Sequence, residues 1–163
     1  MASLNDFTLP AHARVWIYQS SRFFTTEETV LIQKKIDEFA ASWHAHADKL
    51  SAEIKVLHNL FIVVAVDEMA AKASGCSIDK SVRLIKELEN ELNLTLTGRT
   101  TVAWFDAENQ MQLTHFNTLK EYLQDGGVSE NLVMFNNLVS TLADMREQWV
   151  VRLKDSWIMK IPA

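Results

Sequence analysis

The chain has 163 residues, of which 48% are hydrophobic and 23% are charged, and its formal net charge at pH 7 is −5. A chain of this length and balance forms one hydrophobic core without needing disulfides or a structural metal. Its acidic balance, without any run of Lys or Arg, argues against nucleic acid as a partner, because phosphate binding needs a basic surface.

Cysteine content and hydropathy point to the compartment. The first ten residues contain neither the basic nor the apolar segment of a secretory leader, and the longest apolar run is far too short to span a bilayer. The single cysteine, Cys76, has no partner for an internal disulfide, which agrees with a reducing compartment. We therefore expect a cytoplasmic protein that has no membrane partner.

The first two predicted elements are a strand and a helix. Val15–Tyr18 is a short apolar and aromatic run, which is typical of a buried strand. Thr25 and Glu28 have the spacing of a capping box, in which each side chain accepts a hydrogen bond from the other residue's backbone amide. The helix that follows has apolar residues at helical spacing, at Leu31, Ile32, Ile36, Phe39, Ala40 and Trp43.

A β-hairpin is predicted next. Polar and apolar residues alternate over Glu53–Leu57, which indicates an edge strand, whereas Leu60–Val66 is apolar throughout, which indicates a central strand. His58 and Asn59 lie between these strands and form a two-residue turn in this interpretation.

A second amphipathic helix is predicted from about Ser77 to Asn93. A further hairpin follows it, because the strand-like runs Thr101–Phe105 and Met111–Thr114 flank a polar turn. The apolar stripe of the helix comprises Ile78, Val82, Ile85, Leu88 and Leu92.

The last third of the chain predicts two helices and a short strand. Asn117 is placed to cap a helix through Gln124, which Gly126 and Gly127 terminate. Val133–Phe135 has the composition of a short strand. The final helical pattern, which continues in some form to Trp157, comprises Leu138, Leu142, Met145 and Trp149.

The order of these elements predicts an α+β fold. Its first six, β-α-β-β-α-β, match the split β-α-β arrangement of ferredoxin-like domains, in which the first and third strands are central and the second and fourth flank them. The two long helices then cover one face of the sheet. An extra C-terminal hairpin strand and helices complete a single domain over residues 14–163, and residues 1–13 form an N-terminal extension.

Under that topology two loops meet at one end of the sheet. The two-residue turn places Asp67 roughly opposite Leu50, so that residues 43–48 lie near residues 67–77. His12 approaches the same end, because the start of the first strand lies beside the third. The predicted cluster comprises His44, His46, Asp48, Asp67, Glu68, Cys76 and Asp79.

Residues 73–81 hold the only cysteine and one of the four glycines, at the predicted start of the second helix. Unpaired N–H groups and a partial positive charge at a helix start bind anions or activate a thiol. Two interpretations of Cys76 stay open: a reactive thiolate and a buried packing residue. We favour packing, because free cysteine is among the most buried residue types.

The other candidates also have ordinary structural interpretations. Ser74 and Ser77 serve as alternative N-caps, Gly75 permits a sharp turn, and Asp79 interacts favourably with the helix dipole.

The carboxylates and histidines of the cluster are weaker candidates than its helix-start residues. Asp67 and Glu68 return the chain to solvent and, as neighbours in extended backbone, point different ways. His44 and His46 diverge on a helix, so no metal site is predicted.

Several common motifs are missing from the sequence. It has no phosphate-binding Gly-Lys-Ser/Thr loop, no dinucleotide-binding glycine motif, no His-Glu-x-x-His, no Cys-x-x-Cys and no Gly-x-Ser-x-Gly. No cofactor is predicted.

Four stretches, at 15–20, 67–68, 74–82 and 154–157, resemble a family of short, uncharacterised bacterial proteins that often carry the label "ABC transporter ATPase". The resemblance covers most of the chain from about Val15, and Ser-Gly-Cys-Ser-Ile-Asp at 74–79 is its most specific part. The family implies no established activity. Because the phosphate-binding loop is missing, we expect neither tight binding nor hydrolysis of nucleoside triphosphates.

Two functional classes follow from the sequence. The favoured one is a non-catalytic α+β module that binds a protein partner, a second copy of itself or a small anion at the start of the second helix. Its ligand-binding residues are Ser74, Gly75, Ser77, Asp67, Glu68 and Asp79. The alternative is a small thiol-dependent enzyme with Cys76 as the nucleophile and His44 or His46 as the base.

Overall fold

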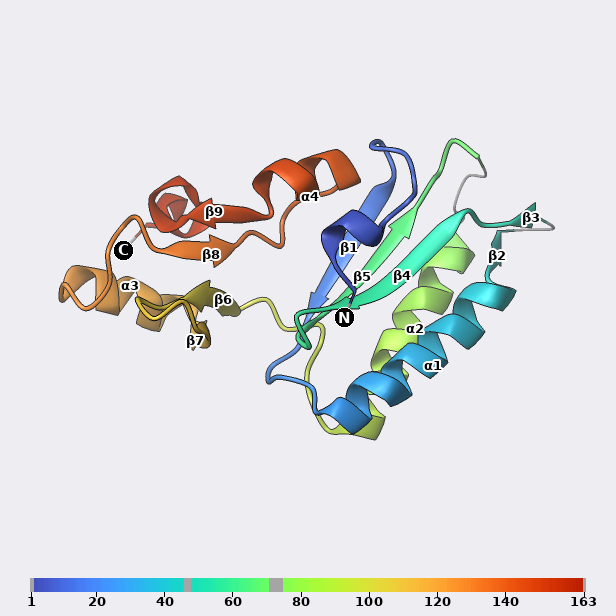
Figure 1. The fold of residues 1–163 in the computed structure, drawn as a ribbon, viewed down its shortest axis with the longest axis horizontal. Coiled ribbons are helices and arrows are strands. Elements are labelled where there is room, and N and C mark those ends of the chain that lie inside the picture. The colour runs from blue at the N-terminus through green and yellow to red at the C-terminus, as the bar shows by residue number, and fades with distance from the viewer. Residues whose placement is uncertain (1, 46–47, 71–74, 163) are drawn as a thin grey trace.

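The computed structural model describes residues 2–45, 48–70 and 75–162. The molecule is elongated, with a three-stranded sheet and two long helices at one end and a four-stranded sheet at the other (Figure 1). In the described chain the named strands pair antiparallel. The predicted α+β class is confirmed.

The first sheet has the order β1-β5-β4. It consists of β1 (Arg14–Gln19), β4 (Ala52–Leu57) and β5 (Phe61–Val66), and all six residues of β5 are buried. The prediction that the run ending at Val66 is a central strand is confirmed.

The fourth predicted strand does not flank β1, so the ferredoxin-like order is not found. β6 (Thr101–Phe105) lies in a second sheet with the order β7-β6-β8-β9, which includes β7 (Met111–His115), β8 (Val133–Phe135) and β9 (Val150–Arg152). The reason is that β6 finds partners on both of its edges in that sheet, where its central residues are buried.

The β4–β5 hairpin turns over three residues rather than two. Leu57 pairs with Phe61, and residues 58 and 59 have positive φ angles of 55° and 50°, which suit a tight hairpin turn. The extra residue shifts the register by one. Asp67 therefore lies opposite Ser51, whose carbonyl oxygen accepts from the Asp67 amide at 2.8 Å, and not opposite Leu50.

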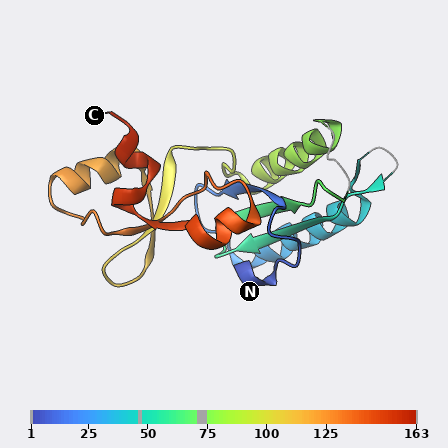
Figure 2. The same cartoon turned by 90° about the horizontal axis from the view of Figure 1, so that it is seen from above.

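Helices α1 (Thr26–Ser42) and α2 (Gly75–Leu92) pack on one face of the first sheet, as predicted (Figures 1 and 2). Thr25 caps α1, and its capping box with Glu28 is complete. None of the described helices is long and apolar enough to cross a membrane.

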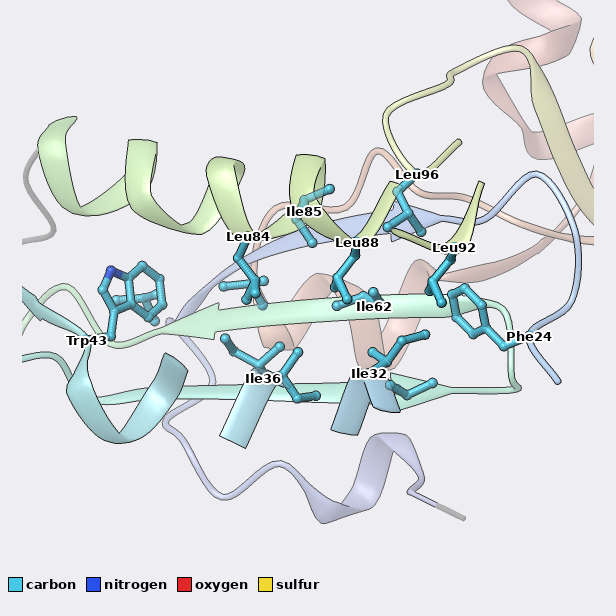
Figure 3. Packing of buried hydrophobic residues seen from close by; sticks show 14 of the residues in the cluster. Phe24, Ile32, Ile36, Trp43, Ile62, Leu84, Ile85, Leu88, Leu92 and Leu96 are labelled. Atoms are coloured by element: carbon cyan, nitrogen blue, oxygen red, sulfur yellow. The ribbon is translucent and has the colours of Figure 1, made fainter. Parts of the chain in front are cut away.

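The core between the sheet and these helices is aliphatic. Leucines of α2 point toward Ile62 of β5, and isoleucines of α1 belong to the same core (Figure 3). Phe24 and Trp43 lie at opposite ends of the core. The labelled helical residues are Ile32, Ile36, Leu84, Ile85, Leu88 and Leu92.

The opposite face of the first sheet packs against the C-terminal part of the chain. Phe61, Val63 and Ala65 of β5 share a core with Phe135 and Trp149, which belong to that part. Residues 2–13 also contribute, since Phe7 is buried there and the amide of Thr8 donates to the Glu53 carboxylate at 3.0 Å. This segment includes a short 3₁₀ helix, η1 (Leu4–Asp6).

The cap of α3 (Phe116–Gln124) differs from the prediction. His115 is the cap, and its Nδ1 accepts from the amide of Asn117 at 3.2 Å. Asn117 is instead the second residue of the helix. As expected, the helix ends before Gly126, which has a positive φ of 74°.

The final helix is shorter than the sequence pattern indicated. Thr141 caps α4 (Leu142–Gln148), so Leu138 lies outside it and is exposed. The chain then continues as β9, since Val150 and Val151 pair with β8, and as two 3₁₀ helices, η2 (Leu153–Asp155) and η3 (Trp157–Lys160).

The start of α1 predicts a pH dependence of stability. The guanidinium of Arg22 makes two 2.8 Å hydrogen bonds to the Glu28 carboxylate, and these, together with a hydrogen bond from the Thr25 amide, lower the pKa of Glu28 from about 4.5 to about 2. A lowered pKa stabilises the folded state above the unfolded value, and this contribution is lost as the pH falls from about 4.5 to about 2. We expect Glu28→Gln to lower the free energy of unfolding by about 1–2 kcal/mol at pH 7, allowing for solvent screening, and by little at pH 2.

Urea unfolding followed by circular dichroism at the two pH values measures this difference. Glu38→Gln is the control, because its pair with Lys34 is exposed and long, at 4.0 Å. A Glu28→Gln variant that is destabilised equally at both pH values contradicts the proposed role of the charge.

Candidate functional site

The start of α2 lies beside the end of α1. The indole Nε1 of Trp43 donates to the carbonyl oxygen of Ser77 at 2.9 Å, and the short strand β2 (His44–Ala45), paired with β3 (Asp48–Lys49), contacts α2. The two predicted loops therefore meet in their described parts. His46 and Ser74 lie outside the described residues.

The interpretation of Cys76 as a buried packing residue is wrong, because this cysteine is exposed. It is the second residue of α2, which begins earlier than predicted. The buried residues of α2, such as Ser81 and Leu84, lie on a different side of the helix, so the thiol is on the surface.

The predicted capping roles near Cys76 also change. Ser77 is the third residue of α2 and is buried, so it is not the N-cap. Gly75 is helical, and a Cβ there would contact no described atom, so its conformation does not require glycine. Asp79 is exposed and is the fifth residue of the helix, beyond the first turn where the dipole acts most strongly.

Asp67 and Glu68 pair with the residues around the start of β1. His12 Nε2 lies 2.9 Å from Asp67 Oδ1, and Arg14 Nη1 lies 3.3 Å from Glu68 Oε1. The hydrogen bond from His12 is the main reason that the pKa of Asp67 is lowered. His12 reaches this end of the sheet as the sequence predicted.

His44 presents one ring nitrogen as a possible base. Its Nδ1 lies 2.6 Å from the carbonyl oxygen of Ser42, which only accepts, so in the neutral ring Nδ1 carries the proton and Nε2 is the acceptor. No hydrogen bond joins His44 to Cys76 in the described chain. Within the same residues no group of three or more His, Cys, Asp or Glu is placed to hold a metal ion.

A cleft of about 420 Å³ follows β1 where the two sheets meet. One wall is β1 itself, and the others are residues 96–102, which lead from α2 to β6, and residues 137–140, which follow β8. Phe135 and Trp157 contribute aromatic surface. The volume is in the range of sites for small ligands, roughly 300–1,000 Å³.

The outer edge of β1 is only partly paired. Beyond β5, the amide of Val15 donates to Ser140 O and Ala13 O accepts from the amide of Leu142, both at 2.9 Å. Alternation along an antiparallel strand directs the N–H and C=O groups of Ile17 and Gln19 to that same outer edge. Over the described residues these groups have no backbone partner there, and they line the cleft.

A series of hydrogen bonds through the side-chain amides of Asn137 and Gln19 links the walls of the cleft. Trp149 Nε1 donates to Asn137 Oδ1 at 2.9 Å, and Asn137 Nδ2 donates to Gln19 Oε1 at 2.8 Å. Gln19 Nε2 then donates to Thr101 O at 3.0 Å. We call Gln19, Asn137 and Trp149 the amide clamp. It connects β1 to both segments of the second half of the chain that line the cleft.

The cleft carries positive charge. Arg14 lies at one end of β1, with its guanidinium carbon 4.6 Å from the centre of the Trp16 ring. Arg99 is near Tyr18 at the other end: burial raises the pKa of Tyr18, and the charge of Arg99 partly opposes this. None of the described residues that line the cleft is Asp or Glu.

A second cavity, of about 690 Å³, lies between the β6–β7 turn and residues 127–133. Its rim carries Asp106 and Glu108. The Asp106 carboxylate already accepts from the amides of Glu108 and Gln110 and from the side chain of Gln112. Because that carboxylate holds the turn together, this cavity is the weaker candidate for a ligand.

Few local sequence features mark the residues of the cleft. Gln19 is a polar residue at the end of an apolar strand, and that is the only local feature that distinguishes it. Arg99 and Asn137 lie in loops far from β1 in sequence, and only the tertiary fold brings them to it.

Comparisons with protein-family models, with curated proteins and with solved structures each gave no significant match. The resemblance to the family labelled "ABC transporter ATPase" therefore stays a prediction.

The amide clamp makes a prediction about stability. Asn137→Ala leaves the buried indole N–H of Trp149 and the buried Oε1 of Gln19 without their partner, which costs about 2–3 kcal/mol of unfolding free energy. Chemical unfolding followed by tryptophan fluorescence measures the loss. Asn131→Ala is the matched control, because Asn131 is exposed, and it should change stability by less than about 0.5 kcal/mol. Equal stability of the two variants contradicts a role for the clamp.

Proposed function

We propose that this protein is a non-catalytic binding module and that the cleft along β1 binds an acidic ligand. One observation carries the proposal: a cleft lined by Arg14, Arg99 and aromatic side chains, without a carboxylate among its described lining residues, in a chain whose net charge is −5. Positive lining in an otherwise acidic protein selects for negative charge.

The two arginines are not equivalent. Arg14 shares its charge with Glu68 and stacks on Trp16, whereas Arg99 is exposed and has no ion pair with a described carboxylate. A guanidinium binds a carboxylate through two parallel hydrogen bonds. Arg99 is therefore the residue that we expect to bind the acidic group.

The start of α2 is the other location for the same function. Gly75 and Cys76 of its first turn are exposed next to β2, which supports the sequence-based proposal of an anion or partner site there. The cleft is preferred because it is concave and combines charge with apolar surface, as ligand sites usually do.

A titration followed by ¹H–¹⁵N NMR discriminates between the two locations. The probes are glutarate, an N-acetylated Glu-Val dipeptide, inorganic phosphate, and ATP with magnesium. We expect the carboxylate probes to shift the amide signals of Ile17, Gln19 and Arg99, and ATP neither to bind tightly nor to be hydrolysed. Shifts confined to Cys76–Asp79 move the function to the helix start, and no shift in either region contradicts the proposal.

The role of Arg99 is tested by reversing its charge. Arg99→Glu should weaken binding of the carboxylate probes by roughly tenfold or more, as expected for loss of a charge-assisted hydrogen bond. Arg152→Glu, on β9 and outside the cleft, is the control and should leave binding unchanged.

The exposure of Cys76 supports a second candidate, the thiol-dependent enzyme. We expect Cys76 to react with a thiol reagent in the native protein, and Cys76→Ala to change the unfolding free energy by less than about 0.5 kcal/mol, because the side chain is on the surface. Labelling kinetics with and without urea measure activation. A native rate similar to the unfolded rate contradicts a nucleophilic role, whereas a rate raised about tenfold or more and lost in His44→Ala supports it.

A further inference from the structure

We infer that the ligand of the cleft is an extended, acidic peptide segment that adds to the outer edge of β1 as an extra strand. This inference rests on the proposed function of the cleft and specifies its ligand. The main evidence is the unpaired backbone of Ile17 and Gln19 inside the cleft. Two N–H groups and two C=O groups at that edge match the hydrogen-bonding pattern of an incoming strand.

The neighbouring chain covers only the start of this edge. Residues 140–142 pair with Ala13 and Val15 in an antiparallel bridge centred on Arg14 and Thr141. Beyond Val15 on β1, the two segments contact each other through side chains instead of backbone, because the side-chain amide of Asn137 donates to that of Gln19. The backbone hydrogen bonds that protect β1 thus stop at Val15, and the amide clamp fixes the position of the segment beyond it.

The second half of β1 has no proline, bulge or lysine to protect its open edge, and the segment nearest to it, residues 137–140, contacts Gln19 through a side chain rather than through the backbone. Natural edge strands are commonly protected by proline, by a bulge, by lysine or by a covering segment. Residues 16–19 are Trp, Ile, Tyr and Gln, and they pair with β5 in an unbroken register. An edge that is regular, mostly apolar and set in a cleft favours strand addition.

The charge and length of the cleft define the peptide. Ile17 and Gln19 are two residues apart, which spans about 7 Å of strand, so that a segment of three to five residues suffices to pair with both. Arg99 lies at the Gln19 end of β1, near Tyr18. An acidic side chain or a terminal carboxylate at that end of the peptide completes the complementarity, and β-branched residues suit the extended conformation.

Selection from a displayed library of random heptapeptides against the full chain tests this inference. We expect selected peptides to share an acidic residue next to β-branched residues. On binding of the best peptide, the amide protons of Ile17 and Gln19 should exchange more slowly, whereas those of Trp16 and Tyr18, already directed to β5, should change little.

N-methylation of the selected peptide, one position at a time, is the decisive measurement. Alternate peptide N–H groups face β1 in a paired strand. Methylation at those positions should weaken binding by roughly tenfold or more, and methylation at the intervening positions by much less. Arg99→Glu should weaken binding of the unmodified peptide, and Arg152→Glu should not.

The outcomes separate this inference from the proposed function. Peptides that bind in the cleft but tolerate methylation equally at all positions overturn strand addition. So does a selection without enriched peptides, if small carboxylates still bind beside Arg99, and in both cases the binding cleft stands. If neither peptides nor carboxylates bind there, both proposals fail.

Discussion

The fold depends on β5 being buried on both of its faces. Ile62, Val64 and Val66 belong to the core beneath α1 and α2, whereas Phe61, Val63 and Ala65 belong to the core shared with the C-terminal part of the chain. A strand of this kind is stable only between two covering layers. The helices supply one layer. The other consists of the second sheet, α4 and the N-terminal segment, and this explains why residues 2–13 are part of the packed structure and why Phe7 is buried.

The cleft is a consequence of this division into two sheets. β6 has partners on both sides within its own sheet, so it is not available to pair with β1. β1 is therefore held on one edge by β5 and on the other by only a short bridge at Arg14 and Thr141. Where the bridge ends, the walls are joined by the amide clamp. Gln19 and Trp149 are buried, so the hydrogen bonds that they make to Asn137 are costly to lose, and the clamp keeps the opening in a defined shape.

Local patterns in the sequence predicted the local features of the fold. The Thr25–Glu28 capping box, the central strand ending at Val66 and the helix stop at Gly126 depend on neighbouring residues, and the structure has all three. Strand partners are a different matter, since the apolar pattern of Thr101–Phe105 fits a flanking strand of either sheet. The cleft could not be predicted for the same reason, because only the tertiary fold brings its residues together. Cys76 stands out because the segment around it, residues 73–81, holds the only cysteine of the chain. The cleft, in contrast, is assembled from Gln19, Arg99 and Asn137, which are far apart along the chain.

The charges around β1 are arranged along its length. At the start of the strand, Asp67 and Glu68 pair with His12 and Arg14, so that the positive charge of Arg14 is largely balanced. At the end of the strand, Arg99 faces the cleft beside Tyr18 without a described carboxylate partner. The positive charge of Arg99 thus lies beside Tyr18, close to the unpaired backbone of Ile17 and Gln19. In the proposed complex, hydrogen bonds to the backbone are indifferent to side chains, so that this charge, together with the aromatic lining, would distinguish one extended segment from another.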